Sequence, residues 1–243
     1  MRAATAIVLG VDASPGGWVA VRLDRGRFAD LDAEAEGTLV RMLRRHRDAD
    51  WIGIDIPVGV VESGWRDADL GARRQLAGRQ ASVFLTPPRP ALDEPTWEGA
   101  NRLARSLPGG AGVSRQAHGL RRRILEVGPL AAADRRLVEV HPELSFAEMA
   151  GVGAGAGLAA KRTALGLLQR HDLLRRQGID LGWRRRLVTL AAGARVLRDV
   201  AAHDVVDAAA AAWSADRRRR GAARSVPEAP TQTDGGRPIA IWV

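Results

Sequence analysis

The sequence predicts an α/β fold built on one mixed, five-stranded sheet that is flanked by helices. Two observations carry this prediction. The chain starts with apolar runs of strand length separated by tight turns, which is typical of antiparallel strands. Later strand-like runs alternate with helical patterns, and such strand–helix crossovers place strands parallel to one another.

The first three strands follow one another through turns. Ile7–Asp12 is apolar up to its final aspartate, which is typical of a buried strand. Proline and two glycines in the next five residues favour a turn. Trp18–Leu23 alternates as an antiparallel partner does, and Arg27–Asp32 follows a further glycine as an edge strand.

A helix and a fourth strand come next. Ala33–Arg47 carries apolar residues at helical spacing, which predicts an amphipathic helix. Trp51–Ile56 has strand character and contains an acid near its end, Asp55, before Pro57 stops it.

The segment 58–135 differs from its surroundings because it is rich in arginine and in helical patterns. These patterns lie around 66–80, 96–106 and 115–126, with proline-rich and glycine-rich loops between them. We interpret the segment as a mainly helical insertion after the fourth strand. It belongs to a single domain over residues 1–243, since this length is short for two full domains.

The remaining chain returns to strand and helix patterns. We expect a strand at Arg136–His141, helices at Ser145–Ala150, Lys161–Gln177, Trp183–Arg198 and His203–Arg219, and a terminal strand or docking tail at Pro238–Val243.

Two glycine-rich segments invite comparison with nucleotide-binding loops. The run Gly151–Gly157 has the wrong spacing for a dinucleotide fingerprint or a P-loop, so we expect a mobile loop there. Gly10–Gly17 more nearly resembles the phosphate-binding hairpin of actin-like kinases. A phosphotransferase therefore stays open as an alternative.

The composition limits the possible functions. The absence of cysteine excludes a disulfide scaffold, a thiolate zinc site, an iron–sulfur cluster and a cysteine nucleophile. Basic side chains number 37 against 28 acidic ones, a net charge of +9 that favours anionic partners, nucleic acid above all. A compositional bias explains the charge equally well, because Lys161 is the only lysine and all other basic residues are arginines.

The sequence predicts no contact with a membrane. The longest early apolar run, Ala3–Val11, is far shorter than the roughly 20 residues that span a bilayer. It is also a poor export signal, because Asp12 and a second strand-like run follow at once. We therefore expect a cytoplasmic protein.

Carboxylates occur where buried backbone is expected to meet solvent. Asp12 and Asp55 end strands, Glu139 interrupts an apolar strand, and Asp204 and Asp207 share one face at the start of a helix. Asp12, Asp55 and Asp204 each have a simpler explanation as a strand end or helix cap, whereas Glu139 is harder to explain in this way because the run around it is otherwise apolar. Together they fit the oxygen ligands that Mg²⁺ or Mn²⁺ prefers. Two such ions can activate water and stabilise the leaving oxygen of a phosphodiester.

These acids resemble the catalytic constellation of the RNase H-like superfamily, in its RuvC-type branch. The whole chain more closely resembles domain-of-unknown-function family 429, whose members are predicted RNase H-like nucleases. The matching segments are Gly17-Trp18, Asp55-Ile-Pro57, Ser82-Val-Phe84, Pro87-Pro-Arg89, Ser114-Arg-Gln116, Glu139-Val-His-Pro-Glu143, Lys161-Arg-Thr163, Asp204-Val-Val-Asp207-Ala208 and Ile239-Ala-Ile-Trp242. The resemblance implies an RNase H-like sheet.

The resemblance also implies roles for the acids. Asp12 corresponds to a carboxylate that bridges the metal ions, and Asp55 to a second ligand that is glutamate in some relatives. Asp204 and Asp207 correspond to metal-binding acids of the C-terminal helix. Glu139 is expected to act in catalysis.

Neighbouring residues complete the expected site. Glu143 is a candidate metal ligand, and His141 and Lys161 are candidate substrate contacts. The alternative for His141 is a structural histidine. The alternatives for Lys161 are an ion pair with an acid and a solvated position on a helix.

Further substrate contacts are expected from the insertion, which should overhang the acids. Arg89, Arg115 and Gln116 stand in loops or at helix starts and suit phosphate binding. The densest arginine runs, at 73–74, 121–123, 184–186 and 217–220, are expected to be mainly solvated faces.

The sequence thus predicts a metal-dependent phosphodiester hydrolase, a nuclease that uses two Mg²⁺ or Mn²⁺ ions on clustered carboxylates. One alternative is a catalytically silent nucleic-acid-binding or regulatory module. Another is an enzyme that acts on a small phosphorylated molecule.

Overall fold

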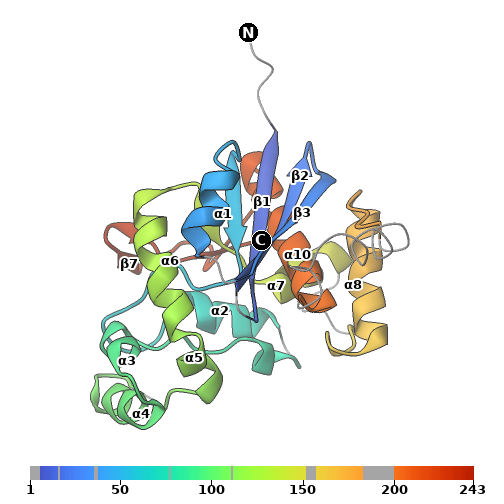
Figure 1. Ribbon diagram of the computed structural model, residues 1–243. Helices are drawn as coiled ribbons and strands as arrows, with labels where there is room; N and C mark the ends of the chain where they lie inside the picture. The colour runs from blue at the N-terminus through green and yellow to red at the C-terminus, as the bar shows by residue number, and fades with distance from the viewer. Residues whose placement is uncertain are drawn as a thin grey trace.

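A five-stranded sheet forms the centre of the molecule in the computed structural model (Figure 1). The structure describes residues 6–15, 17–35, 38–76, 78–110, 112–151, 157–182 and 200–243. The strands are β1 (Ile7–Ser14), β2 (Gly17–Asp24), β3 (Arg27–Ala35), β4 (Trp51–Ile54) and β5 (Leu137–Glu139).

The strand order β3-β2-β1-β4-β5 makes the sheet mixed, as predicted. β1, β2 and β3 are antiparallel neighbours, whereas β4 lies parallel to β1 and β5 lies parallel to β4. The parallel pairs bring the carboxyl ends of β1, β4 and β5 to the same edge of the sheet. This arrangement is consistent with an RNase H-like fold.

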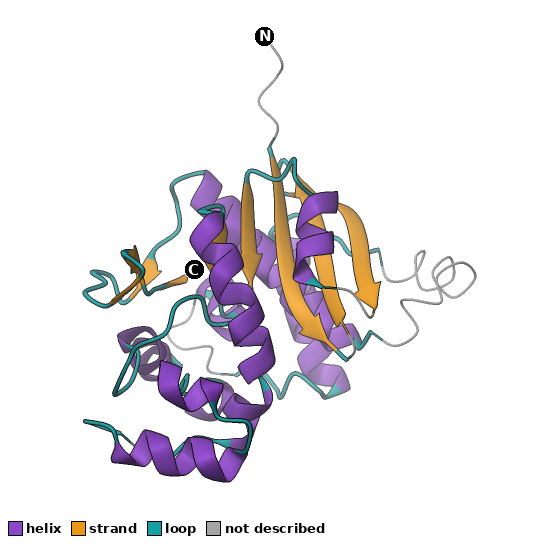
Figure 2. Ribbon diagram, turned by 60° about the vertical axis from the view of Figure 1, so that its left-hand side comes forward, coloured by secondary structure: helices purple, strands orange, loops and turns teal. Residues whose placement is uncertain are grey.

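Helices cover both faces of the sheet (Figure 2). On one face, α1 (Leu39–Arg45) and α6 (Arg121–Ala133) pack with Leu9, Val11, Ile52 and other apolar strand residues. The opposite face is covered by α7 (Pro142–Ala150), α8 (Ala164–Arg176) and α10 (Ala202–Arg219). The strands β1 and β2 therefore send alternate side chains into two separate apolar cores.

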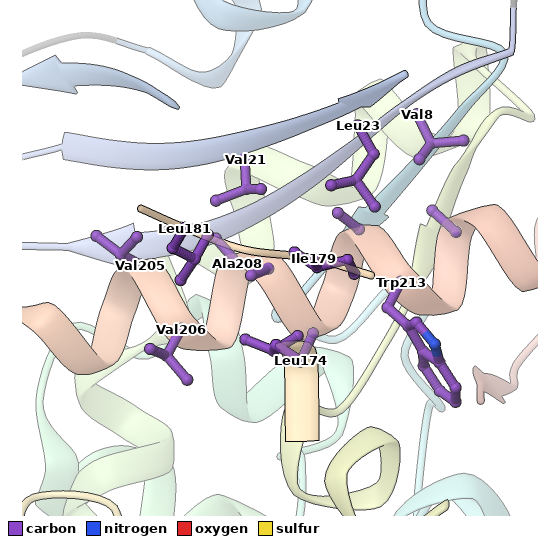
Figure 3. Packing of buried hydrophobic residues seen from close by; sticks show 14 of the residues in the cluster. Val8, Val21, Leu23, Leu174, Ile179, Leu181, Val205, Val206, Ala208 and Trp213 are labelled. Atoms are coloured by element: carbon purple, nitrogen blue, oxygen red, sulfur yellow. The ribbon is translucent and has the colours of Figure 1, made fainter. Parts of the chain in front are cut away.

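The helix α10 lies directly against the backbone of the sheet (Figure 3). A Cβ atom at Gly10 would lie 2.0 Å from the carbonyl oxygen of Ala208 and 2.1 Å from the amide nitrogen of Ala212. A Cβ atom at Gly53 would lie 2.4 Å from the carbonyl oxygen of Ala211. Only glycines on β1 and β4 and small side chains on α10 permit this approach.

The connection from β4 to β5 is mainly helical, as expected for 58–135. It contains α2 (Asp67–Gln75), the 3₁₀ turn η1 (Gln80–Ser82), α3 (Arg89–Asp93), α4 (Trp97–Ser106), α5 (Arg115–Gly119) and α6. The last of these helices packs on the sheet through Ile124, Val127 and Ala131. The helices α3, α4 and α5 gather beyond the end of the sheet (Figure 1).

Several boundaries differ from the sequence-based expectation. The predicted helix 33–47 begins only at Leu39, because β3 continues to Ala35 in register with Gly17 of β2. Residues 142–144 join α7, whose first position suits Pro142. The predicted helix at 183–198 and most of the glycine-rich loop lie outside the described residues.

The C-terminal segment forms short strands rather than one long strand. They are β6 (Ser225–Val226), β7 (Thr233–Asp234), β8 (Arg237–Pro238) and β9 (Ile241–Trp242). The terminal run docks beside the main sheet, since Trp242 forms a parallel bridge with Val140 just after β5. Within the described part of the chain, no helix is long and apolar enough to cross a membrane.

The contact between α10 and the sheet predicts a large effect of Gly10→Ala. The added methyl group meets backbone atoms that cannot rotate away, so the free energy of unfolding should fall by about 3 kcal/mol. Gly119→Ala is the matched control, because a Cβ atom there meets nothing within 4 Å. Urea denaturation followed by circular dichroism measures both variants, and equal stabilities would contradict the tight packing.

Candidate metal centre

Asp12 and Asp55 lie side by side at the ends of two parallel strands. The register pairs Val11 with Ile54, and the amide of Asp55 donates to the carbonyl oxygen of Val11 at 2.9 Å. Val11 and Ile54 face the core beneath α1 and α6. Since side chains alternate along a strand, the next residue on each strand faces α10.

The third carboxylate comes from α10. Asp207 immediately precedes Ala208, whose carbonyl oxygen lies against Gly10, so the close packing of the helix carries Asp207 to the strand ends. One carboxylate oxygen from each of Asp12, Asp55 and Asp207 lies within 4.8 Å of the others. Asp207 is fully buried, and Asp12 is 7% exposed.

Lys161 is the counterion of this cluster. Its Nζ donates to Asp207 Oδ2 at 2.5 Å, across 46 residues of sequence. Burial alone would lower the pKa of Lys161, but the charges of Asp207 and Asp55 raise it above its usual value. The ammonium group is therefore charged and offsets part of the negative charge.

The carboxylates are held in an unfavourable environment. Burial, followed by the repulsion of Asp55 and Asp207, raises the pKa of Asp12 well above its usual value. Burial raises the pKa of Asp55 to about 8, against the opposing charge of Lys161. The pKa of Asp207 is also raised by burial, despite its contact with Lys161. One lysine does not compensate the charge of three clustered acids, two of them buried and one half-buried.

The cluster has the features of a divalent cation site. All its donors are carboxylate oxygens, which hard cations such as Mg²⁺ and Mn²⁺ prefer. Asp207 Oδ1 is buried and has no hydrogen-bond partner in the described part of the chain. An orphaned carboxylate oxygen beside two further acids fits a metal ion, which would supply the missing partner and the missing positive charge.

The cluster opens into a pocket of about 530 Å³. Its walls come from the ends of β1 and β4, the segment 79–84 around η1, helix α5, the start of α7, the loop at 160–162 and the start of α10. The segment between β4 and β5 therefore lies over the acids, the position expected for the insertion. Ligand pockets in proteins commonly have this volume.

Four other predicted residues line the same pocket: Asp204, Gln116, His141 and Glu143. Asp204 stands one helical turn before Asp207 and contacts His203, with 3.2 Å between its Oδ1 and the histidine Nε2. Gln116 enters from α5. His141 donates from Nε2 to the carbonyl oxygen of Ser82 at 3.3 Å, and burial lowers its pKa, which favours the neutral ring.

The structure does not bring Glu139 to the cluster. Its register partner is Ile54, so its side chain faces the side of the sheet opposite to α10. There it accepts hydrogen bonds from the guanidinium of Arg66 and, at 2.6 Å, from the amide of Val58. Burial raises the pKa of Glu139 to about 7 against the charge of Arg66. Glu139 thus forms a buried ion pair with Arg66 outside the carboxylate cluster, and the catalytic role expected of it stays a prediction.

Glu143, expected as a metal ligand, lines the pocket but already has cationic partners. Arg170 donates to its two oxygens at 2.8 and 2.9 Å, and Arg79 forms a further ion pair with it. Burial would raise the pKa of Glu143, but Arg170 and then Arg79 hold it below its usual value. Both carboxylate oxygens of Glu143 are thus bonded to arginines, and Glu143 does not belong to the cluster of Asp12, Asp55 and Asp207.

Two predicted substrate contacts lie away from the pocket. Arg89 bonds Glu62 at 2.8 Å and Asp234 at 2.6 Å beside a separate cavity of about 290 Å³. Arg115 stacks its guanidinium 4.1 Å from the ring centre of Trp97. Neither belongs to the residues that line the acidic pocket.

Several residues of the arginine runs are used within the fold rather than left as solvated charges. Arg218 stacks on Trp51 and Trp242, and Arg123 stacks on Trp18. Part of the positive charge therefore stabilises the protein itself. The run 184–186 lies outside the described residues.

Sequence reasoning missed three pocket residues: Arg79, Arg162 and His203. His203 precedes Asp204, and Arg162 follows Lys161, so proximity to predicted residues was a usable signal for both. Arg79 offered none, because it stands in an arginine-rich helical stretch far from any acid in sequence.

The raised pKa values predict how stability depends on pH without metal. Asp55 loses its proton near pH 3.8 when unfolded and near pH 8 when folded, so the folded state binds more protons between these values. The free energy of unfolding should therefore fall as pH rises from about 4 to about 8. Urea titrations in EDTA measure this decline.

Asp55→Asn is the control, and it should make the decline shallower. Saturating Mg²⁺ should do the same for the unchanged protein, because a cation on the cluster compensates its charge. A metal-free stability that rises with pH over this range, or that is unaffected by Asp55→Asn, would contradict the described electrostatics.

Comparison with known proteins places the chain in a family. No curated protein and no solved structure matches it significantly. The model of the family described as "Protein of unknown function (DUF429)" matches residues 10–232, a range that runs from Gly10 past the end of α10 and includes all three clustered acids. Because this match covers most of the 243 residues, the chain belongs to the DUF429 family.

Proposed function

We propose that this protein is a metal-dependent phosphodiester hydrolase, a nuclease in which Asp12, Asp55 and Asp207 hold divalent Mg²⁺ or Mn²⁺. The observation that carries the proposal is the convergence of these three carboxylates, from β1, the end of β4 and α10, to within 4.8 Å of one another, with Asp12 and Asp207 buried and Asp55 half-buried. The clustered carboxylates repel one another and so destabilise the folded protein. Such an arrangement is typical of a functional site, here one that binds a cation.

The chain's own residues have distinct tasks in this proposal. Asp12, Asp55 and Asp207 bind and orient the metal, which when bound supplies activation of water and stabilisation of the leaving oxygen. Asp204 extends the acidic surface to the mouth of the pocket. The apolar side chains Phe84 and Leu120 on the wall restrict water around the reacting groups.

Lys161 contributes in two states. In the described structure it neutralises Asp207, and its side chain remains 38% exposed toward the pocket. A divalent ion held by Asp207 would supply that neutralisation, and the ammonium group would then be free to contact a phosphate oxygen of the substrate. This exchange gives the lysine a role in both folding and substrate binding.

Nucleic acid is the substrate class we propose, since its phosphodiesters match both the metal site and the net charge of +9. A small phosphorylated molecule is the second candidate. The observation in its favour is the bounded pocket of about 530 Å³, a volume typical of sites for small ligands.

Asp12→Asn tests the proposed chemistry. The substitution keeps the side-chain shape but removes one charge, so Mn²⁺ affinity should fall at least about tenfold and hydrolysis by orders of magnitude. The metal-free protein should become more stable, because one of the mutually repelling acids is gone. Calorimetric Mn²⁺ titration and cleavage of single-stranded, duplex, hybrid and branched nucleic acids measure these effects.

Asp48→Asn is the matched control, since Asp48 bonds Arg22 on the surface. Equal cleavage by wild type and Asp12→Asn would identify a contaminating nuclease and contradict the proposal. Turnover confined to nucleotides or small phosphate esters would favour the second candidate, and binding without turnover of any substrate would favour a silent module.

Lys161→Gln separates charge compensation from metal binding. Without the ammonium group the metal-free protein should lose stability. Mn²⁺ should bind more tightly, because the ammonium group no longer competes with the ion for Asp207. Thermal unfolding in EDTA and calorimetric titration measure the two effects. Arg175→Gln, which removes one charge from an exposed position on α8 outside the pocket, is the control. Weaker Mn²⁺ binding by Lys161→Gln would show that the lysine supports the metal rather than competing with it.

A further inference from the structure

Arg79 is a pocket residue whose backbone is fixed in place. Its carbonyl oxygen accepts hydrogen bonds from the amide of Ser82 at 2.9 Å and from Ser82 Oγ at 2.7 Å. The carbonyl oxygen of Ser82 in turn accepts from His141 at the start of α7. The η1 turn is thereby docked on the segment that follows β5.

The side chain of Arg79 is fixed as well. Its Nη2 forms an ion pair with Glu143 Oε2, and Glu143 is clamped by Arg170, whose side chain is only 1% exposed. Arg170 also donates from Nη1 to the carbonyl oxygens of Ala159 and Gly166, both at 2.9 Å. One buried pair, Glu143 and Arg170, thus connects Arg79 to the loop that carries Lys161.

This arrangement leaves part of the guanidinium of Arg79 unused. Nη1 is buried and has no hydrogen-bond partner in the described part of the chain. Arginine stays charged, so a shielded N–H donor without an acceptor is unfavourable and would be relieved by an anionic oxygen. Lys161, by contrast, already has its partner in Asp207.

We propose that Arg79 is an anion-binding residue of the acidic pocket and that it receives a phosphate oxygen of the substrate through Nη1. The ligand class rests on the proposed function, which puts a phosphate at this site. A guanidinium suits this task, because it presents several donors in a fixed plane. Its rigid attachment at both ends means that little side-chain entropy is lost on binding.

The same contacts give Glu143 a task other than metal binding. Glu143 is a positioning residue: it orients Arg79 through Nη2 and leaves Nη1 for the ligand. The pocket then holds two kinds of group, carboxylates that attract a metal on its floor and a fixed arginine on its wall. A phosphate is a group that Arg79 and a metal ion held by the carboxylates could contact at once, through different oxygens.

Arg79→Gln tests the proposal by binding rather than by turnover. Inorganic phosphate is titrated into the full-length protein by calorimetry at low salt, once in EDTA and once with Mg²⁺. Loss of one hydrogen bond from a charged donor should weaken phosphate binding about 10- to 100-fold. Arg74→Gln removes the same charge from an exposed position on α2 outside the pocket, and it should leave binding unchanged within about twofold.

Arg79→Lys guards against a general loss of structure, because it keeps a charge beside Glu143 but not the second guanidinium nitrogen. We expect a melting temperature near that of the unchanged protein and intermediate phosphate affinity. A deoxynucleoside 5′-monophosphate and a short single-stranded oligonucleotide are titrated in parallel. Dependence on Arg79 for the monophosphate identifies a terminal phosphate, and dependence for the oligonucleotide alone identifies an internal phosphodiester.

The outcome separates this inference from the proposed function. Phosphate binding that depends on Arg79 in a protein that hydrolyses nothing supports the anion site and removes the nuclease. Metal-dependent cleavage combined with unchanged phosphate and oligonucleotide binding by folded Arg79→Gln overturns the anion site and leaves the nuclease in place.

Discussion

The contact of the α10 backbone with Gly10 and Gly53 is the constraint on which the rest of the structure depends. A methyl group on either glycine would collide with the helix, so the sheet and α10 meet at backbone distance. This approach carries Asp207, one residue before Ala208, to the ends of two strands that it would not otherwise reach. The alanines of α10 are therefore a packing requirement of the site, beyond any bias of composition.

Placing three acids at this contact makes folding and function oppose each other. Burial and mutual repulsion raise the pKa values of Asp12, Asp55 and Asp207, and one lysine compensates only part of their charge. An unfavourable local arrangement of this kind persists only where the surrounding fold is stable enough to hold it. Here the two apolar cores on opposite faces of the sheet hold the acids in place. A divalent cation would relieve the unfavourable arrangement, which links occupancy of the site to the stability of the whole protein.

Residue patterns were sufficient to predict the mixed sheet and the acids at Asp12 and Asp55, because strand runs and glycine–x–aspartate endings are local features. Asp207 was predicted from its helical position and the family resemblance. Residue patterns could not predict the direction of the Glu139 side chain, because that direction depends on the pairing of Glu139 with Ile54. A shift of the strand register by one residue would turn the side chain toward α10. Residue patterns also missed the contacts of Glu143 with Arg170 and Arg79, which join residues far apart in sequence. Arg89 and Arg115 were chosen by their loop or helix-start positions, but ion pairing and stacking hold them away from the pocket.

A crystal structure of the protein soaked in Mn²⁺, with an anomalous difference map, tests the central claim most directly. We expect an anomalous peak within coordination distance of carboxylate oxygens of Asp12, Asp55 and Asp207, and we expect Lys161 to have moved away from Asp207. The contrary result is a map without a peak at these acids, with Lys161 still bonded to Asp207, from a crystal in which Mn²⁺ occupies other positions. In that case the buried acids would be a structural cluster neutralised by the lysine alone.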